Sequence, residues 1–297
     1  MRQAHDIICI GSVLWDVIGR SPGHLGPGAD VPGRITRLPG GVAMNIAMTL
    51  RRFGMTPALL SVVGRDAEGR ELLAACARMG MVTEHIYISE DMPTDRYMAI
   101  EGGNGLVAAV ADAHSLEAAG ARILAPLQDG TLGSAEAPYG GIIALDGNLT
   151  EALLAEIAAS PTFAAADLRV APASPGKAER LLPLIARPGV TLYLNCQEAG
   201  IVCNTHFDQA AEAARALVAR GVRRVLVTNG GAPAAEGSPQ GIREVTPPRV
   251  PVTRVTGAGD TFMAAHIAAE ARGADPLQAL HTALRAATDH VSGDIRA

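Results

Sequence analysis

Short apolar runs alternate with longer amphipathic segments along most of this chain, and that alternation limits the folds open to it. Runs typical of buried strands lie at residues 7–11, 59–63, 142–145, 168–171, 190–194 and 224–228. Helical patterns lie between them, at residues 42–53, 69–79, 151–159, 177–186 and 207–220. Repeated strand–helix units form a mostly parallel sheet with helices on both faces. The sequence therefore predicts a single α/β domain over residues 1–297.

The composition of the chain limits the classes of molecule that it is expected to bind. Hydrophobic residues make up 48% of the chain and aromatic residues only 3%, so the predicted core is aliphatic and alanine-rich. A net charge of −5 argues against a nucleic-acid or anionic-membrane surface, because both need concentrated Lys and Arg. No apolar run is long enough to cross a membrane, the start lacks a secretory signal, and the four scattered cysteines indicate reduced thiols. We expect a soluble, cytoplasmic protein with a small-molecule partner.

The pattern changes between residues 82 and 111, where short runs with β character replace the strand–helix alternation. These runs lie at 83–88, 96–101 and 106–111, and Gly102-Gly103-Asn104-Gly105 between the last two predicts a hairpin. A small β-sheet inserted between α/β units predicts a lid that excludes water from a group being transferred. An edge of such a lid could pair with a second subunit, so a homodimer through the lid is a further expectation.

A glycine loop at residues 256–260, Thr-Gly-Ala-Gly-Asp, opens a helical pattern. Glycine lets the backbone turn sharply and approach a ligand, and the unpaired amides of a helix start attract an anion. Gly257, Ala258 and Gly259 would hold the charge on a transferred group, while Asp260 would accept a proton from the attacking hydroxyl. The alternative is a turn with an N-cap aspartate. Neither the P-loop nor the dinucleotide-binding pattern is present.

Two earlier stretches carry polar groups where a ligand is expected. Asp16 follows the first predicted strand, at the sheet edge where open α/β sheets bind ligands, although a turn aspartate is the alternative. Gly40 and Gly41 precede a helix with Asn45 on its first turn. Glycines there allow close approach of a polyhydroxy ligand, and the Asn amide can both donate and accept. The alternative is an ordinary loop with a solvated asparagine.

Taken together, several motifs resemble those of the ribokinase-like sugar kinases, also called the PfkB family. They are the early Gly-Gly before a helix, Asn-x-x-Glu at 195–198, Thr-x-Gly-Gly at 228–231, and Thr-Gly-Ala-Gly-Asp at 256–260. The correspondence runs from residue 7 to about residue 292. Within that family, the stretches 93–100, 106–112 and 145–149 look most like pseudouridine kinases. The resemblance implies a ribokinase-like fold and transfer of phosphate from ATP, with Mg²⁺, to the 5′-hydroxyl of pseudouridine.

The resemblance also implies roles for individual residues. Asp260 would be the general base, and the amides of residues 257–259 would form the anion hole for the γ-phosphate. The ribose hydroxyls would be held by Asp16, Gly40, Gly41 and Asn45. The nucleotide would contact Thr228 and Gly230, and the Asn195–Glu198 motif would organise Mg²⁺ and phosphates. Thr94, beside Tyr97 on the predicted lid, is a candidate contact for the base, as is the Asp-Gly-Asn block ending at Asn148; the alternative for Thr94 is a solvated lid residue.

Two departures from the family pattern qualify these roles. Pseudouridine kinases usually carry Asp-Pro-Val-Ser-x-x-Lys where this chain has Ala-Pro-Ala-Ser-Pro-Gly-Lys at residues 171–177. Lys177 could therefore neutralise phosphate charge or simply be a solvated lysine. Arg254 stands where relatives often have Asp or Asn, close to a monovalent-cation site, which puts activation by K⁺ in doubt.

Other functions remain open at this point. A kinase of the same family acting on a free sugar, another nucleoside or a sugar phosphate is the nearest alternative. A sugar phosphate would need several Arg or Lys near the acceptor, and the surroundings of Asp16 in the sequence offer none. A non-catalytic nucleoside-binding protein is the second alternative. It would need neither the base Asp260 nor Glu198, so their presence favours catalysis.

Overall fold

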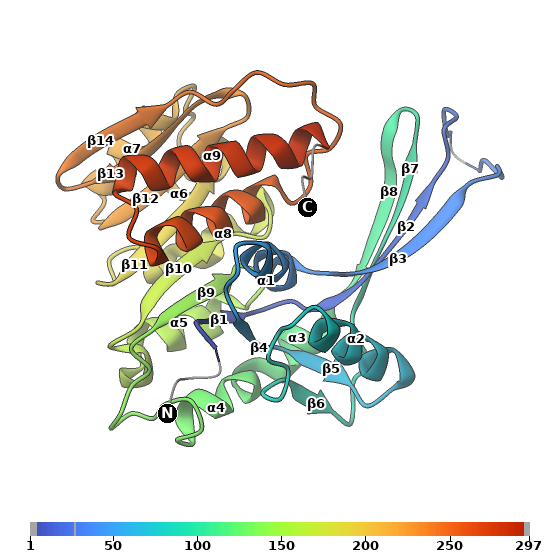
Figure 1. The fold of residues 1–297 in the computed structure, drawn as a ribbon, viewed down its shortest axis with the longest axis horizontal. Coiled ribbons are helices and arrows are strands. Elements are labelled where there is room, and N and C mark those ends of the chain that lie inside the picture. Colours follow the sequence, from blue (N-terminus) through green and yellow to red (C-terminus); the bar gives the residue numbers. More distant parts are fainter. Residues whose placement is uncertain (1–4, 27, 294–297) are drawn as a thin grey trace.

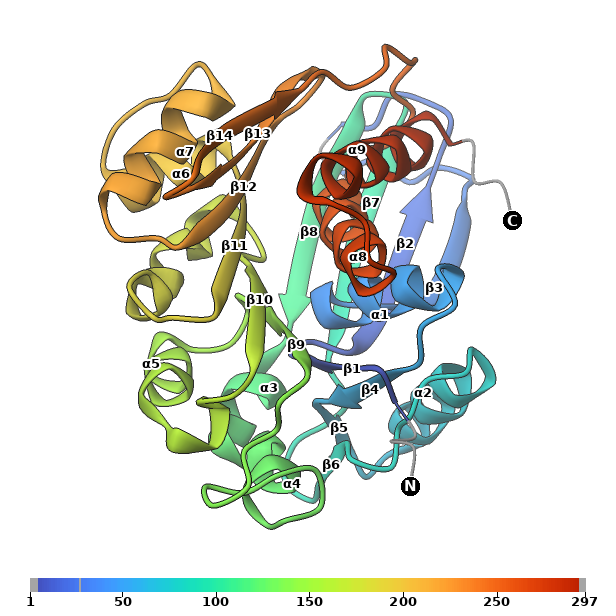
Figure 2. The ribbon, with the colours of Figure 1, turned by 60° about the vertical axis from the view of Figure 1, so that its left-hand side comes forward.

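The computed structural model describes residues 5–26 and 28–293, and an eight-stranded sheet forms its centre (Figures 1 and 2). Its strands are β1 (Ile7–Ile10), β4 (Pro57–Leu60), β9 (Ile142–Asp146), β10 (Asp167–Ala171), β11 (Val190–Asn195), β12 (Arg224–Asn229), β13 (Ala232–Ser238) and β14 (Gly241–Val245). Their order is β14-β13-β12-β11-β10-β9-β1-β4. Every neighbouring pair from β4 to β12 is parallel, and β13 and β14 add an antiparallel edge. The predicted mostly parallel α/β sheet is confirmed.

Helices cover both faces of this sheet (Figure 2). One face carries α1 (Val42–Arg52), α2 (Ala67–Arg78), α8 (Ala258–Ala271) and α9 (Pro276–Ser292). The other carries α3 (His114–Ala119), η1 (Gly120–Leu124), α4 (Ala125–Gln128), α5 (Glu151–Ala159), η2 (Pro161–Phe163), η3 (Pro175–Leu184), α6 (Cys196–Cys203) and α7 (Ala210–Ala219). In β1, Ile7 and Cys9 pack into the first layer while Ile8 and Ile10 pack into the second. Burial on both faces explains why these strands are continuous apolar runs.

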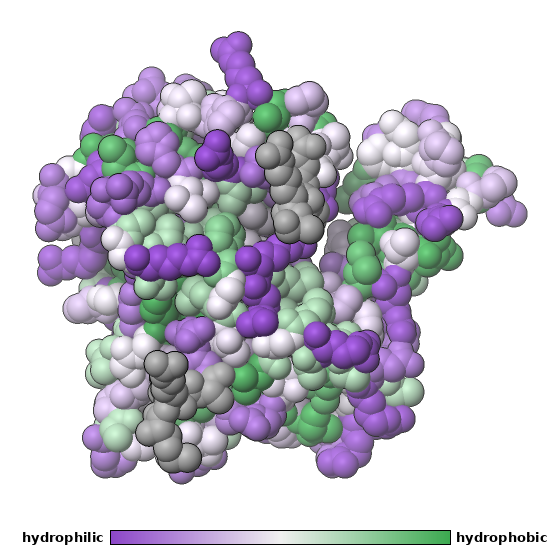
Figure 3. Space-filling view, in the orientation of Figure 1, coloured by the Kyte–Doolittle hydropathy of each residue, from purple (hydrophilic) through white to green (hydrophobic). Residues whose placement is uncertain are grey.

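A second sheet of four strands stands beside the main body (Figure 1). Its strands are β2 (Leu14–Arg20), β3 (Arg34–Gly40), β7 (Arg96–Gly102) and β8 (Gly105–Asp112), in the order β3-β2-β7-β8. The β7–β8 hairpin is antiparallel and turns at the predicted glycine-rich stretch. The space-filling view shows an open recess between this sheet and the main body (Figure 3).

The predicted extent of this sheet, residues 82–111, is wrong in two respects. Half of the sheet comes from residues 14–40, whose strand pattern is interrupted by Asp16, Gly19 and Pro39. Pro39 is tolerated because β3 is an edge strand. In addition, β6 (Tyr87–Ser89) pairs with β5 (Val62–Gly64) rather than with the small sheet.

The base of the small sheet is anchored on α2. The indole Nε1 of Trp15 donates to the carbonyl of Glu68 at 3.0 Å. The guanidinium of Arg37 lies 4.2 Å from the centre of the Trp15 ring and also pairs with Glu71.

The described helices include none that is long and apolar enough to cross a membrane.

Candidate active site

Two helix N-termini meet at the carboxyl edge of the main sheet. Helix α1 begins after Gly41 (φ +98°), and α8 begins after Gly257 (φ +82°), so both starts use a backbone conformation that favours glycine. The side-chain Nδ2 of Asn45 donates to Oδ2 of Asp260 at 2.9 Å. The structure therefore brings the predicted hydroxyl-binding asparagine into direct contact with the predicted base.

The glycine loop supplies two of its three predicted amides as unpaired donors. The amide of Ala258 donates to the carbonyl of Val255 at 3.1 Å and is occupied in a turn. Within residues 5–26 and 28–293, no acceptor is bound to the amides of Gly257 and Gly259. A Cβ at Gly259 would meet no atom within 4 Å, so this side of the loop is open. Unpaired amides at the positive end of a helix dipole form an anion site.

The electrostatics of Asp260 suit a general base. Burial raises the pKa of Asp260 to about 7; the hydrogen bond from Asn45 opposes that rise, and the carboxylates of Asp146 and Glu198 add to it. A base works best when its pKa lies near the working pH, and such shifts are typical of functional carboxylates.

A buried carboxylate fixes the start of α1. Asp146 is fully buried at the end of β9, and its Oδ2 accepts from the amide (2.8 Å) and hydroxyl (2.5 Å) of Ser12. The Ser12 hydroxyl in turn accepts from the amide of Val42, the first residue of α1, at 2.9 Å. This chain of bonds sets the position of Asn45 one turn further on. Sequence reasoning missed Ser12; it singled out the Asp-Gly-Asn block that contains Asp146, but it did not predict that Asp146 positions the start of α1.

Asn148 and Lys177 join the same network. The Nζ of Lys177 donates to Oδ1 of Asn148 at 2.5 Å, and Nδ2 of Asn148 donates to the Ser12 hydroxyl at 3.2 Å. Lys177 is half-buried near the start of η3, and its ammonium is bound by Asn148 rather than by solvent alone. Lys177 and Asn148 therefore extend the hydrogen-bond network of Ser12 and Asp146 with an ammonium and an amide group.

The small sheet carries Asp16 and Tyr97. Asp16 lies beyond the end of β1, as predicted, but within a second strand, β2, where it pairs in register with Tyr97 of β7; the alternative of a turn aspartate is therefore wrong. Burial raises the pKa of Asp16 to about 6. A Cβ at Gly40 would lie 2.0 Å from Oδ2 of Asp16, and a Cβ at Gly41 would lie 2.4 Å from the carbonyl oxygen of Ser12. These glycines thus make room for neighbouring residues of the protein itself.

Thr94 differs from its predicted position. It precedes β7 and is buried; its hydroxyl donates to Oδ1 of Asp66 at 2.7 Å and accepts from the amide of Gly64 at 3.1 Å. Asp66 is the N-cap of α2 and also accepts from the amide of Gly69. The Thr94 side chain therefore serves the fold, and neither a solvated lid position nor a contact with the base fits these bonds.

The predicted nucleotide residues gather at the ends of β11 and β12. Asn195 and Glu198 cap α6 reciprocally: Oδ1 of Asn195 accepts from the Glu198 amide at 2.9 Å, and Oε2 of Glu198 accepts from the Asn195 amide at 2.8 Å. Burial raises the pKa of Glu198 to about 7. Thr228 pairs in register with Asn195, and Gly230 turns the chain with φ +54°.

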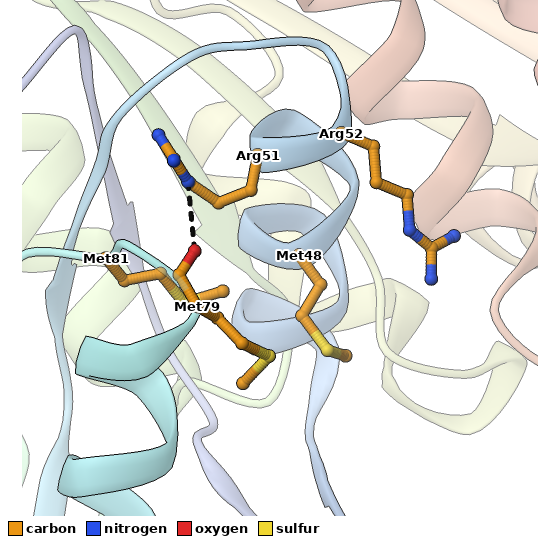
Figure 4. A pocket seen from close by; sticks show the side chains of 5 residues that line it. All are labelled: Met48, Arg51, Arg52, Met79 and Met81. Atoms are coloured by element: carbon orange, nitrogen blue, oxygen red, sulfur yellow. Dashed lines mark hydrogen bonds between the residues drawn. The ribbon is translucent and has the colours of Figure 1, made fainter. Parts of the chain in front are cut away.

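The described surface has two notable hollows, one beside these residues and one far from them. One of about 910 Å³ adjoins the ends of β11 and β12, and Cys196 and Asn229 line part of it. The other, of about 310 Å³, lies at the C-terminal end of α1, opposite the end that carries Asn45 (Figure 4). Arg51 on its wall is already bonded to the carbonyl of Met79 at 3.0 Å. This second hollow is separate from the site.

Comparison with known proteins agrees with this geometry. Residues 4–292 match the family model described as pfkB family carbohydrate kinase. The chain is 31% identical over 274 residues to a pseudouridine kinase of Escherichia coli, covering 89% of this chain and 83% of that one. A carbohydrate kinase from Agrobacterium tumefaciens superimposes with a TM-score of 0.80 at 24% identity, covering 98% of this chain and 94% of that one.

A ribokinase from Thermotoga maritima superimposes with a TM-score of 0.77 at 19% identity, covering 97% of this chain and 93% of that one. These similarities confirm the predicted ribokinase-like fold. Together with the match over nearly the whole chain, they show that this protein belongs to the pfkB family of carbohydrate kinases, phosphotransferases with an alcohol group as acceptor.

Proposed function

We propose that this protein phosphorylates the 5′-hydroxyl of a nucleoside with ATP, and that pseudouridine is its preferred acceptor. The observation that carries the catalytic part is the contact between Asn45 and Asp260 beside the unpaired amides of Gly257 and Gly259. A base of raised pKa and an anion site on one helix N-terminus are what in-line phosphoryl transfer requires.

In the proposed reaction, Asp260 accepts the proton of the 5′-hydroxyl as its oxygen forms a bond to the γ-phosphorus of ATP. The bond between that phosphorus and the β–γ bridging oxygen breaks, and ADP leaves with the bridging oxygen. The amides of Gly257 and Gly259 stabilise the negative charge on the transferred group. The remaining contributions are positional, because phosphoryl transfer asks little covalent chemistry of the protein.

The residues present fit a Mg²⁺ ion. Glu198 offers a buried carboxylate, and Asp146 and Asp260 lie close enough for the three charges to interact. The described residues contain no group of three acidic, His or Cys side chains that could hold a metal alone. Mg²⁺ commonly takes one or two carboxylates together with phosphates and water, so Glu198 would be its protein ligand. When bound, Mg²⁺ neutralises phosphate charge.

The choice of pseudouridine rests on the similarity to the E. coli enzyme and on the polar network. Asp16 and Tyr97 on the small sheet would bind the acceptor's ribose, a role common to all ribosyl acceptors. Lys177 and Asn148 would contribute donors and acceptors to the base. A site that pairs polar atoms of its substrate rejects analogues lacking them far better than an apolar pocket does.

A coupled ADP-release assay over pseudouridine, uridine, adenosine, ribose and fructose 6-phosphate tests both parts. We expect the highest kcat/KM with pseudouridine. Lys177→Met should lower kcat/KM for pseudouridine more than for ribose. A preference for ribose or fructose 6-phosphate would refute the acceptor assignment, and the absence of ADP release with all five acceptors would refute the proposed phosphorylation of these nucleosides.

A further inference from the structure

The last turn of α9 lies against the glycine loop, and one side chain there contacts the loop at two residues and the first turn of α8 at a third. Nε2 of His290 lies 2.8 Å from the carbonyl oxygen of Thr256. Its Nδ1 lies 3.2 Å from the hydroxyl of Thr261, on the first turn of α8. A Cβ at Gly257 would lie 3.3 Å from Cε1 of the same ring, so the imidazole also packs against the glycine.

The partners of the ring define its tautomer. A carbonyl oxygen only accepts, so Nε2 carries a hydrogen and donates to Thr256. In the neutral ring Nδ1 then accepts, and two donors face it: the Thr261 hydroxyl and Nη2 of Arg254 at 3.3 Å. A proton on Nδ1 would confront the guanidinium instead. Burial lowers the pKa of His290; the bond to Thr256 opposes this, and Arg254 and Arg52 lower the pKa further, so the ring is neutral at pH 7.

Arg254 forms a second set of hydrogen bonds between the segment before the loop and α9. Its Nε donates to the carbonyl of His290 at 2.9 Å, and its own amide donates to the carbonyl of Val291 at 3.3 Å. The amide of Thr253 also donates to Val291, at 2.8 Å. A cation at a helix C-terminus interacts favourably with the exposed carbonyls. Residues 253 and 254, which lead into the loop, are thus hydrogen-bonded to the end of α9.

These contacts bear on an amide that the proposed function uses. In a planar trans peptide the carbonyl and the following N–H point in opposite directions. By holding the carbonyl of Thr256, His290 therefore orients the N–H of Gly257 away from α9. We infer that His290 is a positioning residue: it aims the Gly257 amide at the transferred phosphoryl group by fixing the Thr256–Gly257 peptide plane. The inference rests on the proposed kinase function.

Two variants of His290 that differ by one methylene test this inference. The amide of Gln can reach the carbonyl of Thr256, whereas the shorter Asn cannot, and both are polar enough for this half-buried site. His281→Asn makes the same substitution at an exposed position of α9 and serves as the matched control. Hydrogen exchange over residues 255–261 is measured in the protein without nucleotide, and kcat and KM are measured in the ADP-release assay.

We expect His290→Asn to speed exchange in this segment and to lower kcat by roughly 10- to 100-fold, at most the loss seen when an oxyanion donor is removed. The KM for the acceptor should stay within about twofold, because the acceptor residues are untouched. His290→Gln should recover most of both losses.

If His290→Asn matches His281→Asn in exchange and in kcat, the inference is wrong. It is equally wrong if His290→Gln is as impaired as His290→Asn, because then the ring and not the bond to Thr256 matters. If wild-type protein phosphorylates no acceptor, the proposed function fails, while the exchange data still decide whether His290 holds the loop.

Discussion

Removing the side chain of Asn45 should shift the pH dependence of the reaction without destroying the base. Asn45→Ala eliminates the donor that lies 2.9 Å from Oδ2 of Asp260. That bond stabilises the ionised carboxylate, whose pKa burial has already raised to about 7. Without this hydrogen bond the protonated carboxyl becomes still more stable relative to the carboxylate, so Asp260 ionises only at higher pH.

The size of the shift follows from the strength of one hydrogen bond to a charged group. Such bonds contribute about 1.5–3 kcal/mol, and a pKa unit corresponds to about 1.4 kcal/mol, so the pKa of Asp260 should rise by about 1–2 units. At pH 7 the ionised fraction would then fall from about one half to between about one tenth and one hundredth. The rate at pH 7 should drop about 5- to 50-fold and recover above about pH 9.

The measurement is kcat/KM for the acceptor from pH 5.5 to 10 at constant ionic strength, because this ratio reports groups of the free enzyme. Met48→Ala is the control: it removes a side chain one turn along α1 that lines the separate hollow. The fall of kcat/KM toward low pH should be the same in Met48→Ala as in wild type. If Asn45→Ala raises the acceptor KM while this fall stays at the same pH, Asn45 binds acceptor hydroxyls only and the reasoning fails.

Four further outcomes are expected. Folding raises the pKa of Asp260 from 3.8 to about 7, so the protein loses stability as pH rises from about 4 to about 7; Asp260→Asn should therefore raise the melting temperature more at pH 8 than at pH 5, while turnover falls at least about 100-fold. Glu198→Gln keeps the cap of α6 and should raise the Mg²⁺ concentration for half-maximal rate; an unchanged titration would make Glu198 purely structural. Because Arg254 binds the end of α9, rates in KCl and NaCl should be equal, and stimulation by K⁺ would refute this. The proposed homodimer would use the small sheet, on which Met98 (51% exposed) and Val110 (67% exposed) pair in register; light scattering should give a dimer mass for wild type and a monomer mass for Met98→Glu with Val110→Glu, and a monomeric wild type or an unchanged dimer mass would refute this.

The parts of the fold that were predictable are those with strong local signals. Helix α5 matches its predicted range because Thr150 caps it and Leu153, Leu154 and Ile157 bury one face at helical spacing. The β7–β8 hairpin follows from its glycine-rich turn. The glycine loop was recognisable because its two glycines and one aspartate are adjacent in the sequence. Each of these features is complete within a short stretch of chain.

Contacts between distant segments were not predictable in the same way. Nothing near Thr94 indicates that its hydroxyl bonds Asp66 and Gly64, and nothing near His290 indicates the glycine loop. The strands β2 and β3 carry little apolar alternation: β2 is mostly half-buried and β3 is mostly exposed, so neither has one fully buried face along its length. Their pairing depends on register with β7, which a local pattern does not contain.

Gly40 shows how such contacts change the meaning of a motif. From the sequence, Gly40 and Gly41 were interpreted as a space for a polyhydroxy ligand. In the structure, the β2–β3 register places Gly40 opposite Leu14, so that its missing Cβ leaves room for the carboxylate of Asp16. Gly40→Ala would push that short side chain aside while leaving the backbone in place. In the proposed acceptor site the glycine would therefore act indirectly, by setting the position of the aspartate, and a substitution there should weaken acceptor binding without blocking the site.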